Sequence, residues 1–223
     1  MLGYCWLCDQ SLRLGESTGL CRICLADLPR LPPSCLRWRC ARPELANGRY
    51  WFAGFSWQPD IQHLIHRFKF QRCPELAAIL APLLAAQIQH CYRFQQLDWP
   101  DVIVAMPMTY QRWCKRGYNQ AGLLTHQVAR LLQRPVAQGL LRRIRDEEGA
   151  QHQADVGQRW KNMTHSMHCT RSMTGLTVAV VDDVLTTGAS MSAAADALLR
   201  RGAKAVDAWA FAYVEPHQPQ GEP

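Results

Sequence analysis

One stretch of the sequence decides the fold, because an apolar run passes directly into acidic, hydroxyl and glycine residues: Val180-Val181-Asp182-Asp183-Val184-Leu185-Thr186-Thr187-Gly188-Ala189-Ser190. The apolar run begins at residue 176 and predicts a strand that is buried on both faces of a sheet. A helix is predicted directly afterwards, over residues 189–201, because Gly202 is a typical residue after a helix end. Since α/β sheets bind ligands at the carboxyl ends of their strands, the stretch predicts a ligand-binding loop between a strand and a helix.

The residues of this loop suit a sugar phosphate. Backbone N–H groups at a helix start and small hydroxyl side chains can hold a phosphate, and a glycine lets the backbone approach it closely. The loop offers all of these in Thr186, Thr187, Gly188, Ala189 and Ser190. The carboxylates of Asp182 and Asp183 would repel a phosphate, but they can accept hydrogen bonds from ribose hydroxyls or face a hydrated magnesium ion. The competing interpretation is an ordinary strand–turn–helix in which these residues meet by chance.

Strands and helices alternate on both sides of the loop. Short strands are predicted over residues 50–57, 102–106 and 205–214 from their apolar and aromatic runs. Helices are predicted after Pro59, from Pro74 to about His90, and over residues 118–133. On the third helix the residues expected to face inward are Leu123, Leu124, Val128, Leu131 and Leu132.

This alternation implies an α/β domain over residues 50–216, with a mostly parallel sheet flanked by helices. Residues 135–175 interrupt the pattern, because they are polar and weakly periodic. A segment of that length inside a compact domain is typical of a functional lid, or else its elements have been missed.

Residues 1–45 have a different character, with many cysteines, prolines and arginines and few apolar residues from which to build a core. Two Cys-x-x-Cys knuckles separated by twelve residues predict one tetrahedral zinc site. Its ligands would be Cys5, Cys8, Cys21 and Cys24. Zinc would supply folding free energy that so small a core lacks, whereas the alternative is four unpaired thiols. Cys35 and Cys40 form a looser pair, to which the sequence assigns no role.

Composition indicates the kind of partner and the cellular compartment to expect. The chain has 223 residues, of which 48% are hydrophobic, and a net charge of +7, which favours an anionic partner such as a phosphorylated molecule or nucleic acid. No secretory signal precedes the first cysteine, so ten cysteines point to a reducing cytoplasm rather than to disulfides. The longest apolar run, over residues 76–88, is too short to cross a bilayer, and no membrane insertion is expected.

The loop resembles the phosphoribosyl-pyrophosphate (PRPP) signature of the type I phosphoribosyltransferases. Other segments extend the likeness: the Cys₄ module, Leu64-Ile65, Lys69-Phe70, Pro107, and Arg116-Gly117-Tyr118-Asn119-Gln120. In this order they resemble the ComF/GntX family over nearly the whole chain. The chain departs from that family in its missing second knuckle set and in the segment from Gln151 to Asn162, which looks shortened.

The resemblance implies roles for individual residues. Asp182 and Asp183 would be the catalytic pair that holds the ribose hydroxyls, with Mg²⁺ bridging substrate oxygens, and residues 186–190 would hold the 5-phosphate. Pyrophosphate would lie on the loop that contains Met106 and Pro107. The cations expected to clamp phosphates are Arg112, Lys115 and Arg116, although a solvated basic turn is the alternative for each.

The resemblance also implies a role in DNA uptake or in the use of DNA as a nutrient, with PRPP or another ribose 5-phosphate compound as ligand. Single-stranded DNA or a DNA-uptake ATPase would be the partner. Single-stranded DNA is suggested by aromatics that lie among cations, at Arg112-Trp113 and Arg159-Trp160-Lys161. Packing is the competing interpretation of both tryptophans. An active phosphoribosyltransferase of nucleotide salvage or biosynthesis, with an unknown acceptor, is the alternative function. A purely structural zinc adaptor would leave the phosphate loop unexplained.

Overall fold

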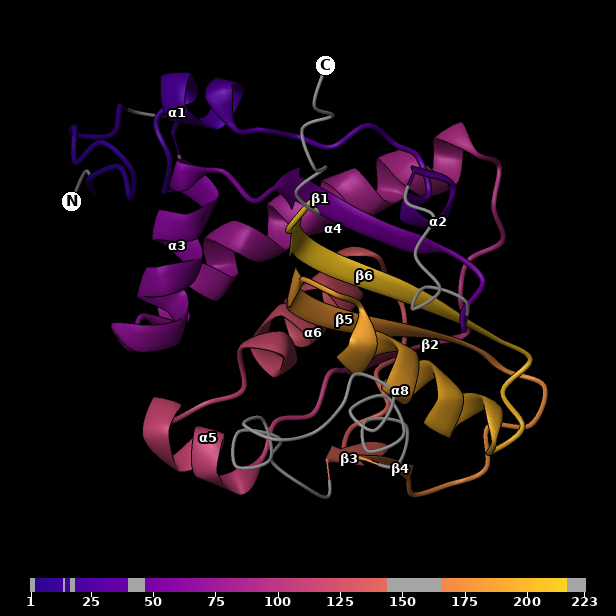
Figure 1. Ribbon diagram of the computed structural model, residues 1–223. Coiled ribbons are helices and arrows are strands. Elements are labelled where there is room, and N and C mark those ends of the chain that lie inside the picture. The colour runs from indigo at the N-terminus through magenta and orange to yellow at the C-terminus, as the bar shows by residue number, and fades with distance from the viewer. Residues whose placement is uncertain (1–2, 14, 17–18, 40–46, 144–165, 216–223) are drawn as a thin grey trace, which may run out of the picture.

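The computed structural model describes residues 3–13, 15–16, 19–39, 47–143 and 166–215. Its centre is a parallel sheet of four strands (Figure 1). In spatial order these strands are β1 (Trp51–Ser56), β6 (Ala205–Tyr213), β5 (Thr177–Leu185) and β2 (Val102–Ala105). The fold expected from the sequence, a mostly parallel sheet flanked by helices, is confirmed.

Strands β5 and β6 form the middle of the sheet and are almost entirely buried. In the register, Val180 of β5 lies between Val104 of β2 and Ala208 of β6. Two neighbours and two covered faces explain why these strands consist of nearly continuous apolar residues. The parallel arrangement brings the carboxyl ends of β5 and β2 to the same edge, so the loops that follow them are neighbours.

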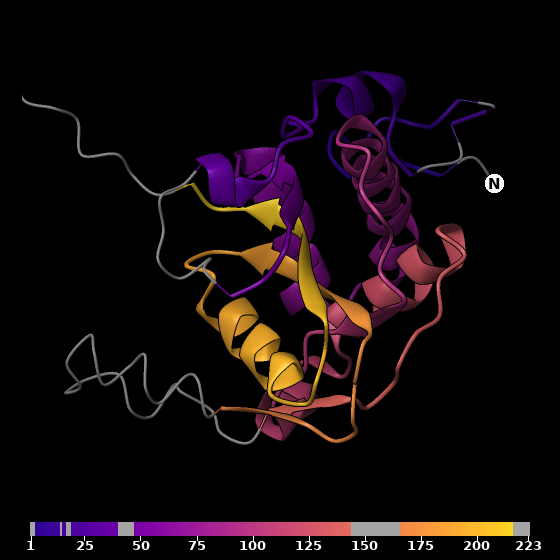
Figure 2. The same cartoon turned by 90° about the vertical axis from the view of Figure 1, so that its right-hand side faces the viewer.

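Helices cover both faces of the sheet (Figure 2). Helix α8 (Ala189–Leu199) packs on β5 and β6 from one side, and its many alanines allow a close approach. Helices α4 (Ala77–Phe94) and α6 (Gln120–Leu131) pack together on the opposite face, α4 against β1 and α6 against β5 and β2. The core is therefore three-layered, as expected of a doubly covered parallel sheet.

The remaining elements surround this core. Helix α3 (Pro59–Phe70) follows β1 and buries one face. A short 3₁₀ turn, η2 (Pro74–Leu76), leads into α4, and helix α5 (Tyr110–Arg116) lies between β2 and α6. The small elements of the chain are α1 (Arg22–Asp27), α2 (Leu36–Arg39), β3 (Leu141–Arg143) and β4 (Met167–Cys169).

The N-terminal segment is joined to the sheet through backbone hydrogen bonds. The Leu31 N–H donates to the Gly54 carbonyl at 3.0 Å, and the Ser56 N–H donates to the Pro29 carbonyl at 2.8 Å. Residues 29–31 thereby run antiparallel beside β1 and cover its outer edge. The buried leucines of this segment also join the same hydrophobic core as the sheet, so the segment is not packed as a separate unit: Leu12, Leu20, Leu28, Leu31 and Leu36.

Several details differ from the sequence-based expectations. The helix expected to end at about residue 90 continues to Phe94, and the next one begins at Gln120 rather than at residue 118. Leu131 was expected to face inward, but its side chain is 48% exposed because α6 ends there and leaves the sheet. Residues 110–116 form a helix that the sequence analysis did not predict.

The segment over residues 135–175 contains more than a loop. It contributes the antiparallel pair of β3 and β4, which packs against α8. Each strand has only three residues, too few to show a periodic pattern in the sequence. Among the described helices, none combines the length and the apolar character needed to cross a membrane.

Candidate functional site: a charged cavity and a four-cysteine cluster

A cavity of about 730 Å³ opens at the carboxyl ends of β5 and β2. Its walls come from three directions: the loop after β5 with the start of α8, the loop after β2 with α5 and the start of α6, and the length of α3. Most of the ligand-binding residues expected from the sequence line it. They are Met106, Pro107, Arg112, Arg116, Asp182, Asp183, Thr186 and Ser190.

The turn between β5 and α8 is shaped by Gly188. This residue has a φ of 87°, in the left-handed region that a side chain would strain, and it immediately precedes the helix. Because glycine has no side chain with which to cap the helix, the first amides of α8 are left for the loop or for a ligand. The Ala189 N–H donates to the Thr187 hydroxyl at 3.4 Å, while Thr186 and Thr187 are exposed to solvent.

The two carboxylates at the end of β5 have different surroundings. Asp183 is buried and forms an ion pair with Lys69 of α3, with 2.8 Å between Nζ and Oδ1. Asp182 accepts a hydrogen bond from the Asp183 N–H at 2.8 Å. Burial, followed by the charge of Asp183, raises the pKa of Asp182 to about 7, against a smaller lowering by Lys69. One carboxylate is thus already paired with a cation, and the other changes its charge near neutral pH.

The four cations of the cavity come from three elements. Arg112 and Arg116 lie on α5, Lys69 on α3 and Arg143 at the end of β3. An Arg143 Nη2 donates to the Ser190 hydroxyl at 2.9 Å, which fixes both side chains at the start of α8. Lys115 lies on the exposed side of α5, away from the residues that line the cavity. A cavity lined by four cationic side chains and two carboxylates suits a ligand that has both phosphates and hydroxyls.

The loop after β2 is held in place by the first turn of α6. The Asn119 Nδ2 donates to the Met106 carbonyl at 3.0 Å, which joins the helix start to the loop. Next to them, Arg116 Nη1 donates to the Gln120 Oε1 at 3.3 Å. The side chain of Gln120 is only 1% exposed although it lines the cavity.

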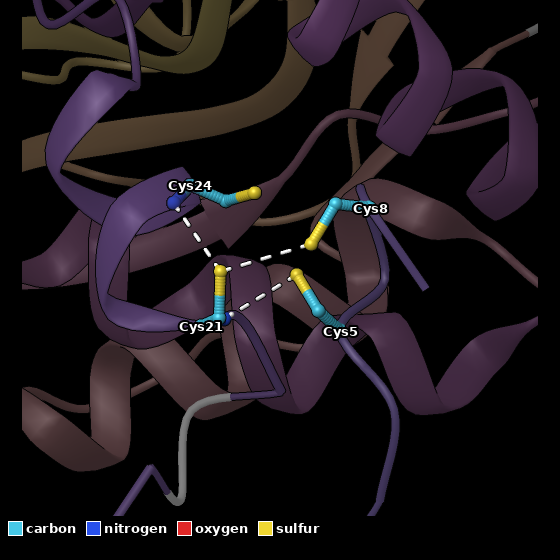
Figure 3. A group of neighbouring side chains, drawn as sticks. All are labelled: Cys5, Cys8, Cys21 and Cys24. Carbon is cyan, nitrogen blue, oxygen red and sulfur yellow. Dashed lines mark hydrogen bonds between the residues drawn. The ribbon is translucent and has the colours of Figure 1, made fainter. Parts of the chain in front are cut away.

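The four cysteines of the two knuckles form a compact cluster (Figure 3). All four Sγ atoms lie within 4.8 Å of one another, and those of Cys8 and Cys21 are 3.8 Å apart. Tetrahedral zinc with Zn–S bonds of about 2.3 Å separates its sulfur ligands by about 3.8 Å, so the cluster fits such an ion. Backbone N–H groups of Cys21 and Cys24 donate to the Sγ atoms of Cys5 and Cys21 at 3.3 and 3.5 Å. Such hydrogen bonds stabilise thiolates, the form in which cysteine binds metal.

Cys35 does not belong to this cluster. It is fully buried, and its Sγ accepts a hydrogen bond from the Trp51 N–H at 3.3 Å, at the start of β1. Its position beside the sheet gives it a packing role, and Cys40 lies outside the described residues.

Known proteins are similar to this chain over most of its length. Residues 122–221 match the phosphoribosyl transferase domain family. The DNA utilization protein YhgH of Salmonella typhimurium is 33% identical in an alignment of 219 positions, which covers 93% of this chain and 95% of that protein. Competence protein F of Haemophilus influenzae is 28% identical, covering 94% of this chain and 90% of that protein. The chain belongs to the ComF/GntX family.

More distant ComF/GntX relatives span a similar length. Competence protein ComFC of Bacillus subtilis is 24% identical, covering 89% of this chain and 78% of that protein. Among solved structures, the glutamine PRPP amidotransferase of B. subtilis is similar with a TM-score of 0.43 and 16% identity. That likeness covers 65% of this chain but only 30% of the amidotransferase.

For this ComF/GntX member, two cavity residues were not foreseen as ligand-binding groups. Lys69 was noted only as part of the family pattern, and Arg143 lay in the segment predicted as a loop. The helical spacing after Pro59 places Lys69 near the carboxyl end of α3, but nothing local predicts that this end faces Asp183. Part of the segment expected as a lid, with Gln151, Arg159, Trp160 and Asn162, lies outside the described residues.

Proposed function

We propose that this protein binds PRPP, or another ribose 5-phosphate compound, together with Mg²⁺, and that it serves DNA uptake or the use of DNA as a nutrient. The single observation that carries the ligand is the shared cavity, in which the paired carboxylates meet the hydroxyl loop and four cationic side chains. The match to the phosphoribosyl transferase domain family supports the same ligand class.

Each part of the ligand has a suitable partner in the cavity. The 5-phosphate would lie on residues 186–190, where the first amides of α8 and the Ser190 hydroxyl can donate to it. The ribose hydroxyls would donate to Asp182 and Asp183. The pyrophosphate would lie between the loop at Met106 and Pro107 and the guanidinium groups of Arg112 and Arg116.

Mg²⁺ would bridge pyrophosphate and ribose oxygens and reduce the negative charge that the two carboxylates face. Because the pKa of Asp182 is about 7, ion binding at that carboxylate would release a proton near neutral pH.

Zinc is our proposal for the Cys₄ cluster, as a structural ion that holds the two knuckles together. The division into a zinc module over residues 1–45 and a phosphoribosyltransferase-like domain over residues 50–216 is likewise a proposal.

The DNA-related role is supported by the names of the relatives, two of which are a DNA utilization protein and a competence protein. One surface feature adds to it. The rings of Tyr110 and Trp113 stack with centroids 6.3 Å apart, and they are 77% and 50% exposed, so Trp113 is not a buried packing residue. Stacked aromatics beside Arg112 and Lys115 suit the bases and phosphates of single-stranded DNA. A DNA-uptake ATPase is the other partner we propose, and the reduced cysteines favour a cytoplasmic location.

A phosphoribosyltransferase with an unknown acceptor is the second candidate function. It is favoured by the aromatic side chains Trp57, His66 and Phe70, which line the same cavity as the carboxylates. In such a transfer the bond from ribose C1 to pyrophosphate breaks, a bond from C1 to the acceptor forms, and the acceptor loses a proton. The two candidates share the ligand and differ only in whether an acceptor enters the same cavity.

Calorimetric titration of the zinc-loaded protein with PRPP and Mg²⁺ tests the ligand. We expect binding in the wild type and its loss in a variant carrying Asp182→Asn and Asp183→Asn, with Lys115→Ala as a control that still binds. The absence of binding in the wild type would overturn the ligand proposal. Release of pyrophosphate on addition of nucleobases or amines would favour the transferase, and binding without release would favour the first function.

A further inference from the structure

The last turn of α3 is held by four consecutive residues, each of which contacts a different part of the molecule. They are Arg67, Phe68, Lys69 and Phe70. Lys69 forms the ion pair with Asp183 at the floor of the cavity. The Tyr118 hydroxyl donates to the Phe68 carbonyl, in front of α6. This short turn therefore connects the carboxylate pair with the start of α6.

The same turn contacts α5 and the cysteine cluster. The guanidinium carbon of Arg116 lies 5.3 Å from the centre of the Phe70 ring. On the other side, the guanidinium carbon of Arg67 lies 4.4 Å from the Trp6 ring centre, and its Nη1 donates to the Trp6 carbonyl at 3.4 Å. Since Trp6 stands between Cys5 and Cys8 in the sequence, one helical turn contacts both the first cysteine knuckle and the cavity.

Trp6 is itself fixed by the fold of the two knuckles. Its N–H donates to the Gly19 carbonyl at 3.0 Å, just before the second knuckle. Gly19 has a φ of 73°, and a Cβ there would come within 2.4 Å of the Ile79 Cδ1 on α4. A side chain at this position would thus strain the backbone and require the Ile79 side chain to shift. The metal would join the two loops that hold Trp6 in place.

From this arrangement we propose that the contact between Trp6 and Arg67 links metal binding to ligand binding, with Arg67 as a positioning residue for Lys69. Arg67 and Lys69 lie two positions apart on one helix, so a displacement of the turn that frees Arg67 also moves Lys69 away from Asp183. Metal in the cluster then favours the arrangement of the cavity that binds a sugar phosphate. By linkage, the ligand tightens the metal by the same factor.

The proposal rests on the proposed function in naming PRPP as the ligand, but its first test needs no ligand. The variant is Arg67→Met, which retains an apolar stem and loses the guanidinium. The matched control is Arg30→Met. Arg30 also joins the N-terminal segment to the domain, but through partners outside α3: its guanidinium carbon lies 6.0 Å from the Phe55 ring centre, and its Nη2 donates to the Leu25 carbonyl at 2.9 Å.

Hydrogen exchange of the amides in residues 61–70 is measured on the full chain with zinc bound. We expect about tenfold faster exchange there in Arg67→Met than in the wild type, with unchanged zinc content and unchanged protection of the knuckles. Arg30→Met should exchange like the wild type in this segment. Equal exchange in Arg67→Met and the wild type would overturn the proposal, whatever the protein does with PRPP.

The second arm titrates PRPP and Mg²⁺ into zinc-loaded and zinc-depleted protein. We expect depletion and Arg67→Met each to weaken binding by about tenfold, and both together to weaken it no more than either alone. Purely additive losses would count against the link. If the zinc-loaded wild type fails to bind PRPP, the proposed function fails while the exchange result still decides the link. If depletion unfolds the chain, the zinc-loaded variants alone decide it.

Discussion

The cysteine cluster and the cavity both gather groups that repel one another when charged, but they are built in different ways. The cluster takes its four thiols from two knuckles in one short segment, and neighbouring backbone amides donate to the sulfurs. The cavity takes two adjacent carboxylates from β5 and opposes them with cations from α3, α5 and β3. A local cluster of four thiols would depend on a bound metal for its stability, whereas a site assembled from distant elements depends on the packing of the whole domain.

The strongest way to break the local site is to remove one of its ligands. Cys21→Ser should abolish stoichiometric zinc binding and lower the melting temperature by about 10 °C, because the metal supplies folding free energy to the knuckles. Zinc content by mass spectrometry and melting by circular dichroism measure this. Cys114→Ser, at an exposed cysteine outside the cluster, should change neither quantity. A fully zinc-loaded Cys21→Ser protein would contradict the assignment.

The central ion pair of the cavity can be broken in the same manner. Lys69→Met leaves Asp183 buried without its cation and should lower the free energy of unfolding by about 2 kcal/mol, since both side chains are largely enclosed. Adding Asp183→Asn should recover most of that loss. Urea unfolding measures both variants, and Arg200→Met, which breaks the more exposed pair with Asp196, should cost less than about 0.5 kcal/mol. Equal losses of unfolding free energy in Lys69→Met and Arg200→Met would contradict the expected difference between the two ion pairs.

The dependence of stability on pH separates the two carboxylates. Between an ordinary aspartate pKa near 4 and its folded value of about 7, Asp182 holds a proton in the folded state that the unfolded chain has lost. Wild-type stability should therefore fall as pH rises through this window. Asp182→Asn should be more stable than the wild type by about 1–2 kcal/mol at pH 8, because it removes a carboxylate whose ionised form is disfavoured in the folded state. The gain is no larger because the Asp182 side chain retains some solvent contact. Urea unfolding of the variant and the wild type at pH 5 and pH 8 tests this. The same difference in unfolding free energy between the two proteins at both pH values would contradict it.

The smallest expected effect compares two cations on α5. Arg112 lines the cavity and Lys115 does not, although the sequence suggested both as phosphate clamps. Arg112→Ala should weaken the binding of pyrophosphate with Mg²⁺ by about tenfold, and Lys115→Ala by less than about twofold. Calorimetry on the two variants measures the ratio. Equal losses would indicate general charge attraction rather than a defined site.

The difference between the two regions also explains what the sequence could predict. The cysteine spacing and the phosphate loop are short, continuous patterns, and the structure keeps each of them together in space. The partners of the carboxylates were not predictable in this way, because Lys69 and Arg143 reach the cavity from segments more than a hundred and about forty positions away, respectively. Their placement depends on how α3 and β3 pack, which no local pattern contains.

Helix α5 was missed for another reason. It has only seven residues, too few for a periodic apolar face, and none of its residues is buried. Its ends did carry signals: Thr109 caps the first turn by accepting the Arg112 N–H, and Gly117 follows the last turn with a φ of 84°. These two caps predict the helix where periodicity does not, and with it the separation of Arg112 from Lys115.

The antiparallel segment over residues 29–31 has a practical consequence for anyone who isolates the phosphoribosyltransferase-like part. A protein that begins at residue 50 would lose the backbone partners of Gly54 and Ser56 and expose a whole strand margin of the sheet. Such a margin pairs readily with another chain. Dimers or aggregates of that shortened protein would reflect the missing residues and not the natural assembly, so studies of oligomeric state need the N-terminal segment in place.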